Sequence, residues 1–266
     1  MTDLRPAYVQ RIGAGPRDLL ALHCTLAHGG TWRGVSEALE NAANVIAMDL
    51  PGHGRNPLVA TEVDFYEHCI AQAGALLTQP MHLAGHSFGA VAALRLALEK
   101  PDLVRSLTLV EPVLFAAVRT DNPSIFAAYA EQMKPFEQAL AEGDDALAAR
   151  LFNRYWGDGT GWDTYPEPVR DYMTRRIGLV TVQAGAVVED SAGILAPGRL
   201  EACSTPILIV EGEHTPPVIR AIHEVLQQRL PKVRRIVIAG ARHMAVQTHP
   251  EQLAAAMLEL FEVAQE

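Results

Sequence analysis

Short apolar runs alternate along the chain with longer segments in which apolar residues recur at helical spacing. The short runs predict six strands, at Leu19–His23, Val45–Met48, His82–Ala84, Leu107–Val110, Ile207–Val210 and Arg235–Ile238. The longer segments predict helices at Thr31–Glu40, Glu62–Leu77, Phe88–Glu99, Pro217–Arg229 and Pro250–Val263. Alternation of this kind is typical of an α/β fold, in which a mostly parallel, doubly wound sheet carries helices on both faces.

One long region interrupts the alternation. Between Pro112 and Thr205 no run has the character of a strand, and helical segments follow one another at Ser124–Glu142, Asp144–Tyr155 and Pro168–Val188. We therefore expect a core domain of residues 1–112 and 205–266, with residues 113–204 inserted as a helical cap. The cap is rich in aromatic residues, most of which should form its own small core. Phe115 and Trp156 are candidates for lining an apolar pocket that faces the sheet.

Composition and charge narrow the function classes. A chain of 266 residues that is 49% hydrophobic is typical of one sizeable globular domain, and its net charge of −9 offers no basic surface for nucleic acid. No apolar run approaches the ~20 residues that cross a bilayer, and the N-terminus lacks the apolar core of a signal peptide, so no membrane association is expected. The three cysteines, Cys24, Cys69 and Cys203, form no CxxC pair. We expect free thiols and a cytoplasmic protein.

The clearest chemical pattern is Gly85-His86-Ser87-Phe88-Gly89, a G-x-S-x-G directly between a predicted strand and a predicted helix. In this context the glycines let a strained serine fit into a sharp turn, which exposes its hydroxyl at the edge of the sheet. Ser87 is therefore the candidate nucleophile.

A serine hydroxyl becomes a nucleophile only when a neighbouring base takes its proton. Of the ten histidines, His243 fits best, because it follows the last predicted strand through a glycine-containing loop and precedes the last helix. His214 is a weaker rival, and the turn constrains His86. The histidines that we expect on helix or loop surfaces are His53, His68, His223 and His249.

In their order along the chain, these features resemble the α/β-hydrolase fold superfamily, of the capped serine hydrolase or esterase type. The resemblance runs from about Ala7 to Val263 and includes DLPGHGR (49–55), the turn at Ser87, RSLTLV (105–110) and ARH (241–243). In the family the base commonly follows a glycine, whereas here Arg242 precedes His243. The resemblance implies a Ser-His-acid triad and no cofactor.

The resemblance leaves two candidates for the acid. In many relatives the acid follows the strand after the cap in a G-x-x-D pattern, but here Thr215 stands at that position and cannot stabilise a charged imidazolium. In another arrangement, which resembles some haloalkane dehalogenases, the acid follows the strand before the cap, where this chain has Glu111. We expect Glu111 to orient His243, with Glu213 as the possible alternative acid at the same edge of the sheet.

Acyl transfer also needs N–H donors for the developing oxyanion. In this family they come from the residue after the nucleophile, here Phe88, and from a loop after an early strand. Two positions could hold the family's His-Gly step. His28-Gly29 lies several residues past the end of the predicted strand Leu19–His23, whereas His23-Cys24 ends that strand and lies at the family's usual distance from Trp32. On this second register Cys24 replaces the customary glycine and Thr25 is the second donor. Leu26, next to Thr25, is a further candidate for the substrate pocket.

Other chemistries find little support in the sequence. Nothing near Cys24 would lower the pKa of its thiol, so we do not expect it to be the nucleophile. His82 and His86 straddle a strand and a turn, which is not the arrangement of a helical zinc site, and no phosphate-binding glycine motif occurs. We therefore predict no metal and no cofactor.

The sequence thus predicts a serine hydrolase that cleaves a small, apolar carboxylic ester through an acyl-enzyme. Three alternatives stay open. The first is a hydrolase of the same fold that acts on a C–C bond, a lactone or an amide, with a substrate carboxylate bound by the cap arginines Arg150, Arg154, Arg175 and Arg176. The second is an acyltransferase, and the third is a ligand-binding protein without catalysis.

Overall fold

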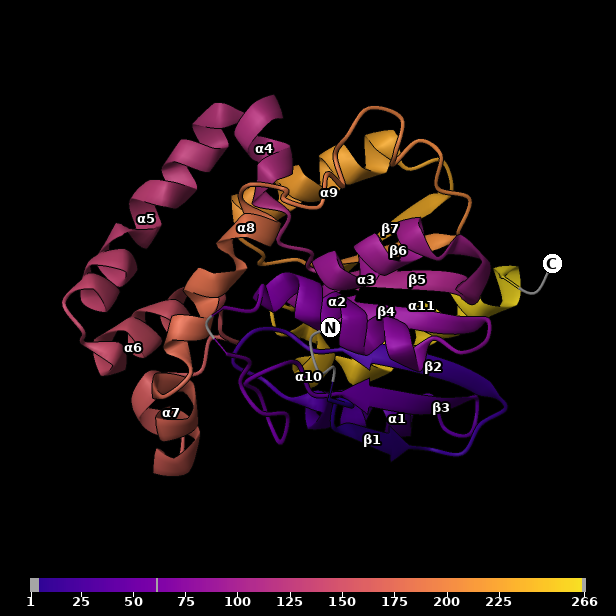
Figure 1. The fold of residues 1–266 in the computed structure, drawn as a ribbon, viewed down its shortest axis with the longest axis horizontal. Coiled ribbons are helices and arrows are strands. Elements are labelled where there is room, and N and C mark those ends of the chain that lie inside the picture. The colour runs from indigo at the N-terminus through magenta and orange to yellow at the C-terminus, as the bar shows by residue number, and fades with distance from the viewer. Residues whose placement is uncertain (1–4, 61, 265–266) are drawn as a thin grey trace.

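A seven-stranded sheet runs through the part of the chain that the computed structural model describes, residues 5–60 and 62–264 (Figure 1). The strands are β1 (Val9–Ile12), β2 (Arg17–Leu22), β3 (Ala43–Met48), β4 (Met81–His86), β5 (Val104–Val110), β6 (Ile207–Gly212) and β7 (Val233–Ile238). Their order is β1-β3-β2-β4-β5-β6-β7, with β1 antiparallel to β3 and the other neighbours parallel. All six predicted strands are present. The apolar runs did not predict β1, because four residues with an exposed Arg11 form too short a pattern.

Helices cover both faces of the sheet, as the alternation of strands and helices predicts. They are α1 (Arg33–Ala38), α2 (Phe65–Leu76), α3 (Phe88–Glu99), α9 (Pro217–Arg229), α10 (Ala245–Thr248) and α11 (Pro250–Val263). Successive strand residues point to opposite faces, so Leu20 and Leu22 enter an apolar cluster with α2, α3 and α9. Leu19 and Ala21 enter a second cluster with α1 and α11. The two clusters pack the sheet between its two layers of helices.

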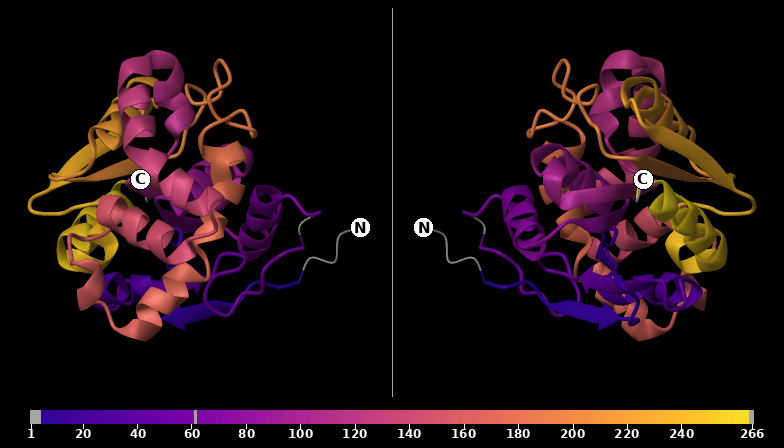
Figure 2. Two further views of the ribbon diagram at one scale, coloured as in Figure 1. Left: turned by 90° about the vertical axis from the view of Figure 1, so that its left-hand side faces the viewer. Right: turned by 90° about the vertical axis from the view of Figure 1, so that its right-hand side faces the viewer.

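The chain leaves the sheet between β5 and β6 to form a helical insertion. It contains α4 (Phe115–Asp121), α5 (Pro123–Ala141), α6 (Asp145–Trp156), α7 (Glu167–Thr174) and α8 (Ala184–Val187). Figure 1 shows α5, α6 and α7 beside the sheet, and the left view of Figure 2 shows them lying across its end. Side chains such as Met133, Phe136 and Ile177 form a small separate core there, whereas α4 is part of the main core.

The predicted helix Pro168–Val188 is wrong as a single element. The structure instead has α7, a 3-10 segment at Ile177–Gln183 and the short α8. Gly178 and the β-branched run Val180-Thr181-Val182 explain the break, because both disfavour the α-helix.

In the described residues no helix has the length and apolar character needed to cross a membrane.

Candidate active site

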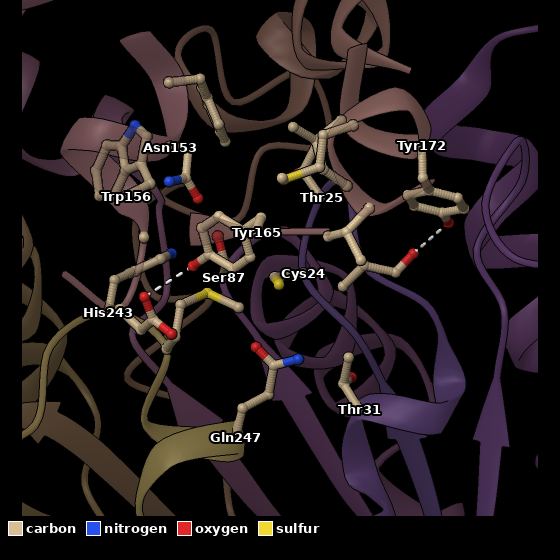
Figure 3. A pocket seen from close by; sticks show the side chains of 18 of the residues that line it. Cys24, Thr25, Thr31, Ser87, Asn153, Trp156, Tyr165, Tyr172, His243 and Gln247 are labelled. Atoms are coloured by element: carbon tan, nitrogen blue, oxygen red, sulfur yellow. Dashed lines mark hydrogen bonds between the residues drawn. The ribbon is translucent and has the colours of Figure 1, made fainter. Parts of the chain in front are cut away.

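The turn between β4 and α3 holds Ser87 in a conformation that side chains rarely adopt. Ser87 has φ 57° and ψ −118°, and strain of this kind costs on the order of 1–3 kcal/mol and clusters at functional sites. Two glycines make the turn possible: a Cβ on Gly85 would overlap the carbonyl oxygen of Gly89, and one on Gly89 would lie 2.5 Å from that of Leu22. The turn leaves the side chain of Ser87 facing a pocket (Figure 3).

His243, on the loop between β7 and α10, lines the same pocket. Its Nδ1 lies 3.1 Å from Oε2 of the fully buried Glu111. Glu111 also accepts hydrogen bonds from the N–H of Gly212, at 2.7 Å, and from the hydroxyl of Thr215. Because an ionised carboxylate can only accept, Nδ1 of His243 carries the proton, and Nε2 is left to accept one. The structure thus brings Ser87 and His243 to one pocket and places Glu111 behind His243.

The surroundings of Glu111 keep it ionised although it is buried. Burial alone would raise its pKa, but the hydrogen bond and charge of His243 lower the pKa below its ordinary value, helped by His223 and the Thr215 hydroxyl. Thr215 stands where the resemblance led us to look for an aspartate, and its hydroxyl instead supports the acid from β5. Glu111 has φ 50°, which lies in the left-handed region that most residues other than glycine disfavour.

The rival acid, Glu213, lies apart from His243. Its side chain is 54% exposed and its Oε2 accepts the N–H of Gly240 at 2.8 Å. Among the described residues no hydrogen bond or ion pair joins Glu213 to His243. The geometry therefore favours Glu111.

His86, inside the serine turn, supports the loop that carries His243. Its Nε2 lies 2.8 Å from the carbonyl oxygen of His243 and donates to it. Burial, followed by the charge of His243, lowers the pKa of His86 to about 3, so the ring is neutral and can keep this bond at ordinary pH. The sequence indicated only that the turn constrains His86.

The loop after β2 and the start of α3 present the two expected oxyanion donors. The N–H of Phe88 belongs to the first turn of α3 and has no carbonyl partner within that helix. Within the described ranges, the N–H of Thr25 has no acceptor. The next residue, Leu26, has φ 63°, and its own N–H donates to Nε2 of His53 at 3.1 Å.

Two buried histidines hold this loop in place: His23, which ends the predicted strand, and His53, which we expected on the surface. His23 donates from Nδ1 to the carbonyl of Cys24 at 2.7 Å and accepts the N–H of Leu50 at 2.9 Å. Burial lowers the pKa of His23 well below its ordinary value and that of His53 to about 4, so both rings are neutral. The surface positions expected for His53 and His223 are wrong, since both are fully buried. The glycines on either side of His53 could have indicated a tight turn, and both have positive φ in the structure.

The thiol of Cys24 also lines the pocket. Burial raises its pKa to about 12, so almost no thiolate is present at neutral pH. Within residues 5–60 and 62–264, no three His, Cys, Asp or Glu side chains gather in a way that could hold a metal ion.

A cavity of about 560 Å³ lies between the sheet edge and the insertion. Leu26 and Trp156 line it, and the Trp156 ring centroid is 4.8 Å from that of His243. The expectation that Phe115 lines the pocket is wrong: its ring stacks on Tyr129 with centroids 4.5 Å apart, in the main core. Lining residues that the sequence did not indicate include Asn153, Tyr165, Tyr172 and Gln247 (Figure 3). Asp158 is another.

The pocket contains a carboxylate and no basic side chain of Lys or Arg among its described lining residues. Oδ1 of Asp158 accepts hydrogen bonds from the Tyr165 hydroxyl at 2.8 Å and the N–H of Thr160 at 2.7 Å. Burial alone would raise the pKa of Asp158, but these hydrogen bonds lower it below its ordinary value. Asp158 is therefore ionised at neutral pH.

The cap arginines face elsewhere. Arg175 lies 3.6 Å from Asp171, and Arg176 stacks over the ring of Tyr172 at 3.8 Å and donates to the Gly52 carbonyl. None of the four arginines lines the pocket. The structure therefore does not support their binding a substrate carboxylate there.

The chain is similar to known proteins over nearly its whole length. Residues 19–256 match the family model described as "Alpha/beta hydrolase family". The chain is 32% identical over 252 residues to a pimeloyl-[acyl-carrier protein] methyl ester esterase of Aeromonas hydrophila, and the matched region covers 92% of this chain and 94% of the relative. A protein of the same name from Aeromonas salmonicida is 30% identical over 251 residues, with the same coverage of 92% and 94%. The crystal structure of an alpha/beta hydrolase from Sphaerobacter thermophilus matches with a TM-score of 0.71 at 22% identity, over 97% of this chain and 99% of that one.

Proposed function

Because the chain belongs to the alpha/beta hydrolase family, we propose that it is a serine hydrolase that cleaves a small carboxylic ester through an acyl-enzyme. One observation carries the proposal: Ser87, on its strained turn, shares a largely apolar pocket with His243, which is hydrogen-bonded to the buried Glu111. Acyl transfer needs this combination of nucleophile, base and orienting acid. The names of the relatives support an ester as the substrate.

In the first half of the proposed reaction, Nε2 of His243 takes the hydroxyl proton of Ser87 while Oγ attacks the ester carbonyl. The carbonyl oxygen becomes an oxyanion, which accepts hydrogen bonds from the N–H groups of Thr25 and Phe88. Glu111 stabilises the imidazolium and holds its Nδ1–H in place. His243 then gives its proton to the departing alcohol, which leaves an acyl group on Ser87.

In the second half, water replaces the alcohol. His243 takes a proton from the water, the resulting nucleophile attacks the acyl carbonyl, and the same two N–H groups hold the second oxyanion. Return of the proton to Oγ of Ser87 releases the carboxylic acid. An alcohol or a thiol in place of water would make the enzyme an acyltransferase.

The charge of the pocket favours an acyl group without a free carboxylate. Among the described lining residues, Asp158 is the carboxylate, and none is Lys or Arg. Asp158 would repel a substrate carboxylate in the same cavity, whereas a neutral ester meets no such repulsion. Apolar side chains such as Leu26, Trp156 and Met173 give the acyl chain its contact surface. We therefore infer a neutral, apolar ester.

A methyl ester carried on an acyl-carrier protein is the second candidate, because two relatives of which 94% is covered are named for that substrate. Its acyl chain bears an ester at one end and a thioester at the other, so it is also neutral inside the pocket. Dimethyl pimelate is a simple probe of this possibility.

Two further assignments accompany the proposal. We infer that residues 113–204 act as the cap over a core of residues 1–112 and 205–266. We also infer that the reaction takes place in the cytoplasm, since Cys24, Cys69 and Cys203 are unpaired thiols.

The test compares wild type, Ser87→Ala and the control Ser204→Ala, which changes an exposed serine outside the pocket. We expect wild type and the control to release p-nitrophenol from acetate and butyrate esters and to react with a fluorophosphonate. Ser87→Ala should lose at least about 1,000-fold in kcat/KM and should not be labelled.

Each other outcome points to an alternative. Labelling of Ser87 without ester cleavage favours a C–C, lactone or amide substrate. Transfer to an added alcohol in preference to water favours an acyltransferase. A folded wild type that is neither labelled nor active would overturn the hydrolase proposal and favour a binding protein.

A further inference from the structure

Building on the proposed function, we propose that the insertion holds the oxyanion loop in its active conformation, with Gln183 and Tyr172 as positioning residues. The oxyanion loop is residues 23–27, which follow β2. Gln183 ends the 3-10 segment of the insertion and Tyr172 lies on α7. The insertion would then act on the chemistry itself, in addition to shaping the pocket.

Hydrogen bonds from the insertion reach the residues on either side of Leu26. The hydroxyl of Thr25 donates to Oε1 of the buried Gln183 at 2.6 Å. The hydroxyl of Tyr172 donates to the carbonyl of Ala27 at 2.7 Å (Figure 3) and accepts the N–H of Gly54 at 2.8 Å. Tyr172 therefore joins the oxyanion loop to the loop after β3.

The side chain of Leu26 lies among apolar residues of the insertion. It is 9% exposed and belongs to the same cluster as Met133, Phe136 and Ile177. This contact matters because Leu26 has φ 63°, a conformation in which a leucine needs support from its surroundings. The insertion thus contacts three consecutive residues of the loop.

The core contributes the rest of the support. Nε2 of His53 accepts the N–H of Leu26 at 3.1 Å. The N–H of Leu26 is thereby engaged, whereas the N–H of Thr25 has no acceptor among the described residues and can serve the oxyanion. A small displacement of a catalytic group is costly, since about 1 Å can reduce a rate about 100-fold. Loss of either contact from the insertion should therefore reduce kcat while leaving substrate binding nearly unchanged.

Tyr172→Phe and Gln183→Met test this with small changes of shape. Each should lower kcat on p-nitrophenyl butyrate by about 10-fold to 100-fold, with KM within about twofold of wild type. Inhibition by a trifluoromethyl ketone, which forms a tetrahedral adduct on Ser87, should weaken by the same factor as kcat/KM. Thr25→Val should resemble Gln183→Met, and Thr25→Ser, which keeps the hydroxyl, should restore activity. Tyr8→Phe, which removes a hydroxyl bonded to Arg55 outside the pocket, is the control.

Hydrogen exchange of the peptide that contains residues 23–28 gives a second readout, independent of turnover. In a wild type that cleaves no ester the proposed function fails, yet exchange still decides whether the insertion holds the loop. Faster exchange of this peptide in Tyr172→Phe and Gln183→Met, with melting temperatures close to that of Tyr8→Phe, supports the proposal. Unchanged exchange, or a loss of activity that resides in KM, overturns it.

Discussion

Replacing Glu111 by glutamine is the sharpest test of the proposed triad, because it changes one hydrogen-bonding pattern and almost no volume. In the structure Oε1 accepts the N–H of Gly212 at 2.7 Å, while Oε2 faces Nδ1 of His243 at 3.1 Å and the hydroxyl of Thr215. In Glu111→Gln, the amide oxygen keeps the bond to Gly212, so the NH₂ group turns toward His243. A donor then meets a donor.

The expected cost follows from this mismatch. His243 can meet an NH₂ group only by moving its proton from Nδ1 to Nε2, which removes the lone pair that should take the proton of Ser87. The same change of tautomer in a serine protease triad lowers kcat on the order of 10⁴-fold, equivalent to about 5 kcal/mol in the barrier. Because Glu111 is fully buried, solvent cannot replace the lost acceptor.

The assay is hydrolysis of p-nitrophenyl butyrate by wild type, Glu111→Gln and Glu213→Gln. We expect kcat to fall about 1,000-fold to 10,000-fold in Glu111→Gln. In Glu213→Gln it should fall by less than about twofold, because that side chain is 54% exposed, accepts the N–H of Gly240 and lies 3.9 Å from Nε2 of His214. Circular dichroism and thermal unfolding establish that each variant folds. More than about a tenth of wild-type kcat in a folded Glu111→Gln, or a crippled Glu213→Gln, would refute the reasoning.

Two further predictions concern acid pH and substrate charge. His53 has a pKa of about 4 in the folded protein, against about 6.5 in an unfolded chain. Between these pH values the unfolded chain binds a proton that the folded protein does not. The contribution of His53 to the free energy of unfolding is therefore complete above about pH 6.5 and falls as the pH decreases through this window, by up to about 3 kcal/mol. Urea midpoints from about pH 7 to about pH 4 should drop, and less so in His53→Gln; a flat profile contradicts the assignment. Asp158→Asn should reduce the ratio of kcat/KM for dimethyl pimelate to kcat/KM for monomethyl pimelate by about tenfold. The control Asp163→Asn changes a residue on the exposed surface of the insertion and should leave this ratio unchanged. The same ratio in wild type and both variants would contradict a role for Asp158.

Much of the fold was readable from local patterns. The apolar runs predicted the six parallel strands because a strand buried on both faces must be apolar along its length. Gly85 and Gly89 marked the serine turn because no other residue fits between β4 and α3. The short edge strand β1 was missed because four residues carry too little pattern. The end of the α-helix after α7 was missed because the helical spacing of apolar residues continues through residues that disfavour a helix.

The sequence by itself determined which residues at or beyond the strand ends were available for chemistry, among them Ser87, Glu111 and His243. Only the tertiary structure separates the two candidate acids, because Glu111 is buried with its Oε2 3.1 Å from Nδ1 of His243, whereas Glu213 is exposed on the neighbouring strand end. The burial of His53 and the contacts of the insertion with the oxyanion loop also join segments far apart in the chain. Such contacts are set by packing, and no local spacing of residues encodes them.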